Sequence, residues 1–211
     1  MKASNTVDSW TIFGVGNFIF DILDAINANN ENATRIVTNM QIDAELARRL
    51  PIKIETIGDF RPSTNEKYIF GFLNPNKDTL LELLQTHNLV MSNLIHPKAY
   101  IAQGTVFGAG NYFGAGVVIG PQTKIGRYNY FNRGVLIGHD VKITDNNHFG
   151  PGAIICGRCV IASRNNFGAG SVVNDNISVC SDCTIGSSSA VVKKINKKGL
   201  YIGLPAKLKH S

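Results

Sequence analysis

A long apolar run and a secretory leader are both missing from this sequence. Residues 11–26 are a candidate membrane span, but Asp21 and Asp24 interrupt them, and a spanning helix needs about 20 predominantly apolar residues. The start, Met1 to Asn5, does not read as a signal peptide with a cleavage site. These absences argue against a membrane-embedded or secreted protein, and we expect a cytoplasmic one.

Cysteine is scarce, with four among 211 residues. The spacing of Cys156 with Cys159, and of Cys180 with Cys183, is that of a zinc ribbon. The repeat described below places the two pairs on different edges of a prism, where four sulfurs cannot surround one ion with bonds of about 2.3 Å. We therefore predict small residues in tight corners and no metal. A cytoplasmic location also disfavours disulfides.

Acidic residues are fewer than basic ones, which leaves a net charge of +6 and a pI near 9.2. The excess favours anionic partners. It is concentrated near the C-terminus, in Lys193, Lys194, Lys197, Lys198, Lys207 and Lys209. Only Tyr201 lies among these lysines, whereas nucleic-acid binders usually add arginines or aromatic residues. A small phosphorylated ligand and a merely solvated cationic tail both remain open.

The chain does contain a repeat of six residues, in which every sixth position is large and apolar. A period of six residues matches neither the 3.6-residue period of a helix nor the two-residue period of a flat sheet. It fits a chain that coils around a triangular prism, with one strand and one corner per six residues and one coil per eighteen. The apolar side chains then point inward and stack from coil to coil. They are Ile101, Phe107, Phe113, Ile119, Ile125, Phe131, Ile137, Ile143, Phe149, Ile155, Ile161, Phe167, Val173, Val179, Ile185 and Val191.

The residues before the repeat alternate between strand and helix patterns, which predicts a small parallel sheet. We expect His96-Pro97 to connect it to the coils, because proline disfavours a helix before it. The expected strands are 10–13, 35–38, 53–57, 68–72 and 89–95, and the expected helices are 17–28, with Asn17 as its cap, 42–50 and 76–87.

Two of the five histidines fall at exposed positions of the repeat, where they could border the same edge of the prism. His139 is followed by Asp140, and His148 comes nine residues later. A carboxylate beside an imidazole favours its charged form and can fix its tautomer. A general base that takes a proton from an amine or hydroxyl needs this arrangement. By these residues alone, a surface His-Asp pair is more often incidental than catalytic.

Residues 96–207 resemble the left-handed β-helix acyltransferases built on hexapeptide repeats, most closely the bacterial sugar acetyltransferases of the PglD/NeuD group. The small α/β region before them suits the same group. The stretches that carry the resemblance are Leu94-Ile95-His96-Pro97, Gly138-His139-Asp140-Val141-x-Ile143, His148 with Phe149-Gly150-Pro151-Gly152-Ala153, Gly168-Ala169-Gly170-Ser171-Val172-Val173 and Gly203-Leu204-Pro205-Ala206-Lys207.

The resemblance implies a fold, an activity and a domain order. The fold is a small Rossmann-like α/β domain followed by an all-β left-handed parallel β-helix. Residues 1–95 would bind substrate, residues 96–192 would form the catalytic β-helix, and residues 193–211 would be a basic tail that closes the coenzyme A site. The activity is acetyl-CoA-dependent N-acetylation of a nucleotide-linked amino sugar, expected to be a 4-amino-4,6-dideoxy sugar, for a surface glycan. The protein would be a homotrimer with its sites between subunits.

The resemblance also assigns roles to residues of the coils. His139 would be the general base, and Asp140 would increase its basicity. His148 would lie near the thioester of acetyl-CoA. The remaining residues of the acetyl-CoA site would be Gly157, Ala169, Ser187, Gly203, Pro205 and Lys207.

The first domain matches the group less closely. The group holds the nucleotide diphosphate in a glycine-rich turn, where backbone N–H groups and a helix N-terminus suit an anion. This chain has the shorter turn Gly14-Val15-Gly16-Asn17, and an ordinary tight turn remains an open interpretation. An acidic residue is missing after the second strand, which argues against NAD. The expected substrate-binding residues are Gly14, Gly16, Asn17, Thr38, Asn39 and Asn74.

Three rival functions use the same prism. Acetylation of a hydroxyl, as on a sialic-type sugar, keeps the donor and changes the acceptor. A zinc enzyme such as a carbonic anhydrase needs three convergent histidines, and the coils lack a third. An ice-binding or structural prism would require a flat face of regularly repeated threonines. Thr105, Thr123, Thr144 and Thr184 do not form such a face.

Overall fold

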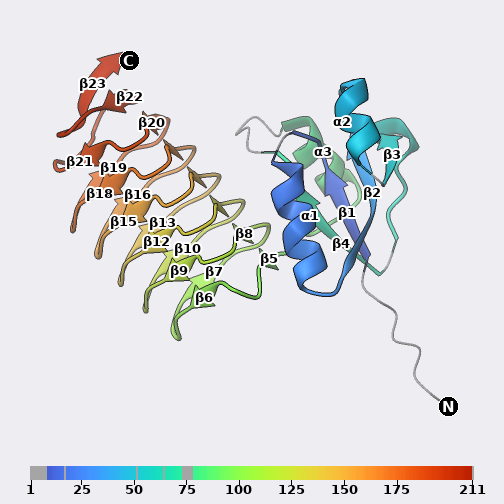
Figure 1. Cartoon of the computed structure of the whole chain (residues 1–211), viewed down its shortest axis with the longest axis horizontal. Coiled ribbons are helices and arrows are strands. Elements are labelled where there is room, and N and C mark those ends of the chain that lie inside the picture. The colour runs from blue at the N-terminus through green and yellow to red at the C-terminus, as the bar shows by residue number, and fades with distance from the viewer. Residues whose placement is uncertain (1–8, 17, 51, 64, 73–77, 211) are drawn as a thin grey trace. The chain divides into compact units, whose positions relative to one another are not determined.

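The computed structural model describes residues 9–16, 18–50, 52–63, 65–72 and 78–210. The chain divides into two compact units, Met1–Leu94 and Ile95–Ser211. The strands form one sheet in the first unit and three in the second (Figure 1).

The first unit is a parallel four-stranded sheet in the order β3-β2-β1-β4, accompanied by helices. The strands are β1 Ser9–Phe13, β2 Asn32–Thr38, β3 Lys53–Thr56 and β4 Glu66–Phe70, and the helices are α1 Ile19–Ala28, α2 Ala44–Arg49, the 3₁₀ turn η1 Ile57–Asp59 and α3 Asp78–Thr86. Four strands and three α-helices lie where the sequence pattern predicts them, to within a few residues. The predicted cap Asn17 lies outside the described residues.

Buried side chains explain why these segments form strands and a helix. The central strand β1 is buried at Trp10, Ile12 and Phe13, as expected for a strand covered on both sides. Helix α1 buries Ile19, Ile22, Ala25 and Ile26, which recur at helical spacing.

The predicted strand over residues 89–95 is wrong. Residues 89–93 form no strand, although the Ser92 amide donates to the Tyr68 carbonyl at 2.8 Å. Only Leu94–Ile95 (β5) is extended, and it joins a sheet of the second unit. An apolar segment that crosses between units has no periodicity to distinguish it from a strand.

The second unit is a parallel β-solenoid whose strands form three sheets. From β6 to β18, each strand pairs with the one eighteen residues further along, as Lys124 with Lys142 and Ile125 with Ile143. The five-stranded sheet holds β7 Val106–Phe107, β10 Lys124–Ile125, β13 Lys142–Ile143, β16 Val160–Ile161 and β19 Ser178–Val179. The six-stranded sheet holds β6 Tyr100–Ile101, β9 Val118–Ile119, β12 Leu136–Ile137, β15 Ile154–Ile155, β18 Val172–Val173 and β21 Ala190–Val191. The eight-stranded sheet holds β5, β8 Tyr112–Phe113, β11 Tyr130–Phe131, β14 His148–Phe149, β17 Asn166–Phe167, β20 Cys183–Ile185, β22 Gly199–Ile202 and β23 Lys207–His210.

Three edges join these sheets, and we name each by a residue that it contains. The His139 edge (120–123, 138–141, 156–159 and 174–177) joins the six-stranded sheet to the five-stranded one. The asparagine edge (108–111, 126–129, 144–147 and 162–165) joins the five-stranded sheet to the eight-stranded one. The Ala169 edge (114–117, 132–135, 150–153, 168–171 and 186–189) joins the eight-stranded sheet to the six-stranded one.

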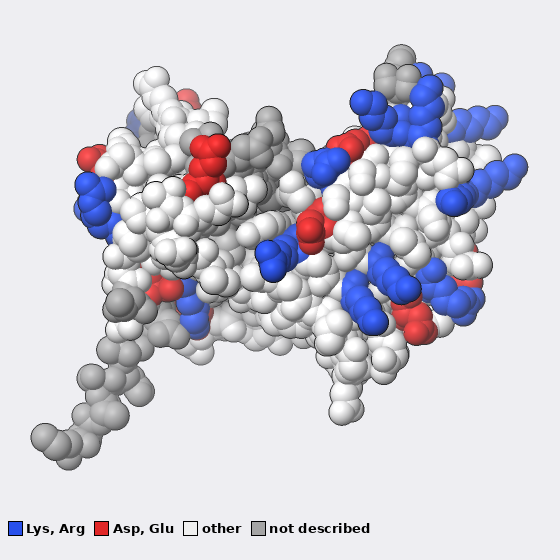
Figure 2. All heavy atoms as spheres, turned by 180° about the vertical axis from the view of Figure 1, so that it is seen from behind, with Lys and Arg blue, Asp and Glu red and all other residues white. Residues whose placement is uncertain are grey.

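The C-terminal segment is a hairpin rather than a tail. Strand β22 extends the eight-stranded sheet parallel to β20, and β23 turns back antiparallel to β22. Lys and Arg side chains gather at this end of the solenoid (Figure 2). The amide of Gly203 donates to the Ser189 hydroxyl at 3.0 Å, and the amide of Ala206 donates to the Ala190 carbonyl at 2.8 Å. Spacing could not show this, because the six-residue beat stops after Val191.

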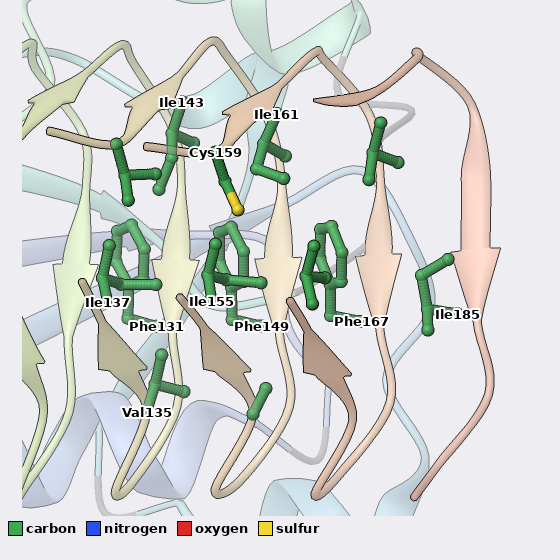
Figure 3. Packing of buried hydrophobic residues seen from close by; sticks show 14 of the residues in the cluster. Phe131, Val135, Ile137, Ile143, Phe149, Ile155, Cys159, Ile161, Phe167 and Ile185 are labelled. Atoms are coloured by element: carbon green, nitrogen blue, oxygen red, sulfur yellow. The ribbon is translucent and has the colours of Figure 1, made fainter. Parts of the chain in front are cut away.

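The interior of the solenoid is filled by the predicted apolar positions (Figure 3). All sixteen form the inward end of a strand, and fourteen are buried, whereas Ile101 and Phe107 near the open end are partly buried. The rings of Phe113, Phe131, Phe149 and Phe167 stack with centroid separations of 5.0, 4.8 and 4.8 Å. The repeat begins one strand earlier than predicted, since Ile95 also packs on this core.

Candidate active site

The side chains of His139 and Asp140 meet at the His139 edge, immediately after β12. The imidazole Nδ1 lies 2.8 Å from Asp140 Oδ2, and the two side chains are 50% and 58% exposed. Asp140 has a φ of +57°, a left-handed conformation that aspartate tolerates better than most residues. A carboxylate at Nδ1 fixes the ring so that Nε2 is the nitrogen available to a reactant.

Gly157 lies beneath the imidazole, one coil further along the same edge. A Cβ atom on Gly157 would lie 2.8 Å from His139 Nε2 and 3.1 Å from Cδ2 and Cε1. The His139 carbonyl also accepts a hydrogen bond from the Arg158 amide at 2.9 Å. Gly157 is buried, and within the described residues its own N–H donates to no protein acceptor. The expected acetyl-CoA residue Gly157 therefore adjoins the candidate base directly.

His148 lies at a different edge from His139, which corrects the expectation of a shared edge. It is the outward residue of β14 and follows the asparagine edge, and its Nδ1 lies 2.9 Å from Asn166 Oδ1. The five-stranded sheet separates the two histidines. Their spacing of nine residues is half a coil, which carries the chain past one whole face.

The other expected acetyl-CoA residues lie along the Ala169 edge. Ala169 and Ser187 are exposed and occupy equivalent positions one coil apart, with the Ser188 amide donating to the Ala169 carbonyl at 2.8 Å. Gly203, Pro205 and Lys207 belong to the hairpin turn that packs on the last corner of this edge. These five residues therefore form one continuous strip, on which Gly157 does not lie.

An apolar face separates this strip from His139. The six-stranded sheet directs a column of apolar side chains outward, and Tyr100, Val118 and Leu136 are 63%, 39% and 41% exposed. Two edges bound this face: the His139 edge on one side and the Ala169 edge on the other. The rest of the column consists of Ile154, Val172 and Ala190.

In the first unit, the turn after β1 has a structural reason for its glycine. A Cβ atom on Gly14 would lie 2.4 Å from the ring of Phe72, and Gly14 has a φ of +72°. The Gly14 amide donates to the Val37 carbonyl at 2.7 Å, which ties the turn to the end of β2. Gly16 accepts a hydrogen bond from the Ile19 amide at the start of α1. Asn17 and Asn74, both expected to bind substrate, lie outside the described residues.

A cavity of about 620 Å³ opens beside Thr38 and Asn39, at the C-terminal ends of β2 and β3. Such an end of a parallel sheet is where ligands of α/β proteins bind. The sequence interpretation found Thr38 and Asn39 but missed the other lining residues, since they come from separate segments. They are Met40, Gln41, Ile42, Ala47, Ile54, Glu55, Thr56, Ile57 and Gly58.

Glu55 is the carboxylate of this cavity, and cations already hold it. Lys53 Nζ lies 2.7 Å from Glu55 Oε1, and Arg35 contacts Oε2 at 3.4 Å. The hydrogen bond from Lys53, with the nearby charges of Lys53 and Arg35, keeps the pKa of Glu55 below its usual value despite desolvation. The carboxylate is therefore ionised at neutral pH.

The two cysteine pairs lie at different edges, which confirms the register inferred from the repeat. Cys156 and Cys159 belong to the His139 edge, whereas Cys180 and Cys183 flank the corner between β19 and β20. Their small side chains fill the corners, and Cys159 Sγ lies 3.1 Å from the Asn174 carbonyl. In the part of the chain that the structure describes, no group of three His, Cys, Asp or Glu side chains is placed to hold a metal ion.

The sequence matches no protein-family model and no curated protein, but its structure resembles solved acetyltransferases. PerB from Caulobacter crescentus, in complex with CoA and GDP-perosamine, superposes with a TM-score of 0.86 over 98% of this chain and 100% of its own, at 24% identity. The acetyltransferase domain of PglB from Neisseria gonorrhoeae, with acetyl coenzyme A, gives 0.83 over 96% and 99%, at 18% identity. WeeI from Acinetobacter baumannii gives 0.81 over 94% and 98%, at 16% identity.

The chain has the fold of the left-handed β-helix sugar acetyltransferases. A coil of the opposite hand could not superpose on them along its whole length, so the solenoid of this chain is left-handed. The aligned residues come from the first unit as well as from the solenoid, because 98% of this chain is covered. None of the helices in the described residues has the length and apolar character to cross a membrane.

Proposed function

We propose that the protein is an acetyl-CoA-dependent N-acetyltransferase that acts on the amino group of a nucleotide-linked amino sugar. The expected acceptor is a 4-amino-4,6-dideoxy sugar. The acetylated sugar would then be incorporated into a surface glycan. One observation carries the proposal: an exposed His139–Asp140 pair lies on a solenoid with the fold of PerB, which binds CoA and GDP-perosamine. Perosamine N-acetyltransferase from Caulobacter crescentus has also been solved with CoA and GDP-perosamine after one histidine was replaced by asparagine or alanine. These variants support the choice of a histidine as the candidate catalytic residue of this chain.

His139 is the proposed general base. The amine attacks the thioester carbonyl, a C–N bond forms, the C–S bond breaks, and coenzyme A leaves as the thiolate, which becomes the thiol when His139 returns the proton that it has accepted from the amine. The amine must lose a proton to become the amide, and the Nε2 atom of His139 accepts it because Asp140 occupies the Nδ1 side at 2.8 Å. Asp140 stabilises the imidazolium that forms and keeps the ring in place.

Gly157 is the proposed donor to the oxyanion. Its N–H has no protein acceptor among the described residues, and it lies one coil from the candidate base. An N–H aimed at the developing oxyanion lowers a barrier by a few kcal/mol, on the order of 3. Ala169, Ser187 and the hairpin residues Gly203, Pro205 and Lys207 are the proposed binding strip for the rest of acetyl-CoA, and His148 remains a proposed contact near the thioester.

The apolar face supports the proposal of a homotrimer with shared sites. When two copies associate through the six-stranded sheet, the His139 edge of one copy faces the Ala169 edge of the next. A closed ring of such head-to-tail contacts buries every apolar column and completes every site. The residues that bind acetyl-CoA and the proposed base then come from different subunits, which explains why one chain separates them by a whole face.

The first unit is the proposed Rossmann-like nucleotide-binding unit. Its cavity beside Thr38 and Asn39 would hold the nucleoside, and the turn Gly14 to Gly16 would hold the diphosphate. The hydrogen bond from Gly14 to Val37 supports this pairing, because it joins the turn to the strand that ends at Thr38. Phe72 covers one side of Gly14, so the phosphates would approach from the other. Asn17 and Asn74 remain proposed contacts. A reaction that consumes acetyl-CoA fits the expected cytoplasmic location.

Release of free thiol from acetyl-CoA, measured over a panel of nucleotide-linked amino sugars, tests the proposal. We expect one acceptor to support turnover, and the matched sugar with a hydroxyl in place of the amine to be inactive. His139→Ala should lower kcat by roughly 10²- to 10⁴-fold, the usual contribution of a positioned base, with little change in acetyl-CoA affinity. Asp140→Asn should lower kcat by a smaller factor than His139→Ala. His148→Ala should weaken the use of acetyl-CoA more than it slows proton removal. Near-normal kcat in His139→Ala would refute the assignment.

A further inference from the structure

The second unit carries most of the positive charge of the protein and few acids to balance it. Residues 95–211 contain thirteen Lys and Arg residues, four Asp and no Glu. All four aspartates are engaged. Asp140 contacts His139, Asp175 pairs with Arg158, Asp182 pairs with Arg164, and Asp145 accepts from the Arg127 amide. The basic side chains of residues 95–211 therefore outnumber the acidic ones by nine.

Two of these cations lie side by side next to the candidate base. Lys124 and Lys142 are the outward residues of β10 and β13, and they are directly paired in register. Both are exposed, and neither forms a salt bridge within the described residues. Lys142 follows Asp140 by two residues, so the pair is on the five-stranded sheet where it meets the His139 edge. The neighbouring outward positions in this column are uncharged: Val106, Val160 and Ser178.

Like charges on directly opposite strand positions destabilise a sheet. An anion that bridges the two ammonium groups removes this repulsion and gains a charge-assisted hydrogen bond from each. Both proposed substrates carry phosphate groups, whereas the reacting amine and thioester are not anionic. Resting on the proposed function, we infer that Lys124 and Lys142 form a phosphate-binding site beside His139, occupied by a phosphate of acetyl-CoA or, in place of the turn Gly14 to Gly16, by the diphosphate of the nucleotide sugar.

Inorganic pyrophosphate is the probe, with binding measured by calorimetry on the full-length protein. Lys124→Gln and Lys142→Gln should each weaken pyrophosphate binding roughly tenfold, the loss of one charge-assisted contact. The double variant should be at least as thermally stable as the wild type, because a repulsive pair is gone. Lys98→Gln, an exposed lysine elsewhere on the solenoid, changes the net charge equally and should leave binding unchanged.

Kinetics then distinguish the source of the phosphate. A rise in KM confined to the sugar nucleotide assigns the site to the acceptor, and a rise confined to acetyl-CoA assigns it to the donor. In both cases kcat of the lysine variants at saturating substrate should equal that of the wild type. Unchanged pyrophosphate affinity in the double variant, an equal loss in Lys98→Gln, or unchanged KM for both substrates would overturn the inference. A wild type that binds pyrophosphate through these lysines but transfers no acetyl group would refute the proposed function and leave the site standing.

Discussion

At the scale of single residues, the environment of His139 decides what its imidazole can do. Asp140 holds one ring nitrogen, and the bare backbone of Gly157 supports the opposite side of the ring. The φ of Gly157 lies outside the left-handed region, so backbone strain does not require glycine here. The close approach of His139 does.

Gly157→Ala tests this contact. The added methyl group would lie 2.8 Å from Nε2, and the half-exposed imidazole can swing aside at little cost in stability. We expect near-normal thermal stability and a fall in kcat of about 10²-fold, the typical cost of displacing a catalytic group by an ångström. The matched control is the same change in a His139→Ala background, where it should lower the residual rate no further. A further loss there would mean that Gly157 acts independently of the ring.

Cys183 makes stability depend on pH. Its buried thiol lies 3.6 Å from Cys180 Sγ, and burial, followed by the contact with Cys180, raises the pKa of Cys183 from 9.0 to about 12. The unfolded chain therefore loses this proton first, so the stabilising contribution is complete below pH 9 and decreases as pH rises toward 12. At about pH 10 the loss is on the order of 1 kcal/mol. Melting temperatures across this range should fall less steeply in Cys183→Ala, while Cys156→Ala should keep the wild-type slope.

At the scale of elements, two-residue strands are stable only because each stacks on the strand of the next coil. The ring of Phe149 lies between Phe131 and Phe167, with both centroids at 4.8 Å and nearly parallel planes. On the asparagine edge, the Asn147 amide donates to Asn129 Oδ1 at 3.0 Å, and the Asn165 amide donates to Asn147 Oδ1 at 2.9 Å. Each coil therefore depends mainly on its two neighbours, as in other solenoids.

Phe149→Ala should remove a large part of the stability of the central coils. The side chain is fully buried, and truncation of a buried phenylalanine costs about 3–5 kcal/mol. Urea denaturation should report this as a lower free energy of unfolding. Val160→Ala, on an outward position that is 43% exposed, is the control and should stay within about 0.5 kcal/mol of the wild type. Equal losses in the two variants would contradict the inward assignment of position 149.

At the scale of the whole molecule, the apolar face between the His139 edge and the Ala169 edge predicts association. We expect light scattering to find a homotrimer, and two inactive variants to complement each other. His139→Ala removes the proposed base, and Ala169→Trp obstructs the opposing strip. After exchange of equally mixed subunits, about a quarter of the sites should combine an intact edge from each parent, as head-to-tail symmetry requires. A stable, active monomer, or no recovered activity, would contradict shared sites.

The sequence by itself determined the solenoid, its register and the candidate base. Apolar residues at every sixth position can all be buried together only if they point into the interior of a prism. A shift of the strand register by one residue would expose phenylalanines such as Phe131 and Phe149. The same frame separated the two cysteine pairs correctly. The strands and helices of the first unit were also predictable, because their apolar periodicity is local.

Tertiary structure decided what depends on contacts between distant segments. The expectation that His148 borders the same edge as His139 was wrong, because a spacing of nine residues is half a coil and carries the chain past the whole five-stranded face. The strand expected over 89–95 is reduced to Leu94–Ile95, and the segment expected as a basic C-terminal tail contains the hairpin of β22 and β23, because no repeat constrains either segment. The ring of Phe72 on Gly14, the imidazole of His139 on Gly157 and the paired lysines on β10 and β13 exist only once the chain has coiled. Their physical cause is proximity across strands and coils, which no local pattern encodes.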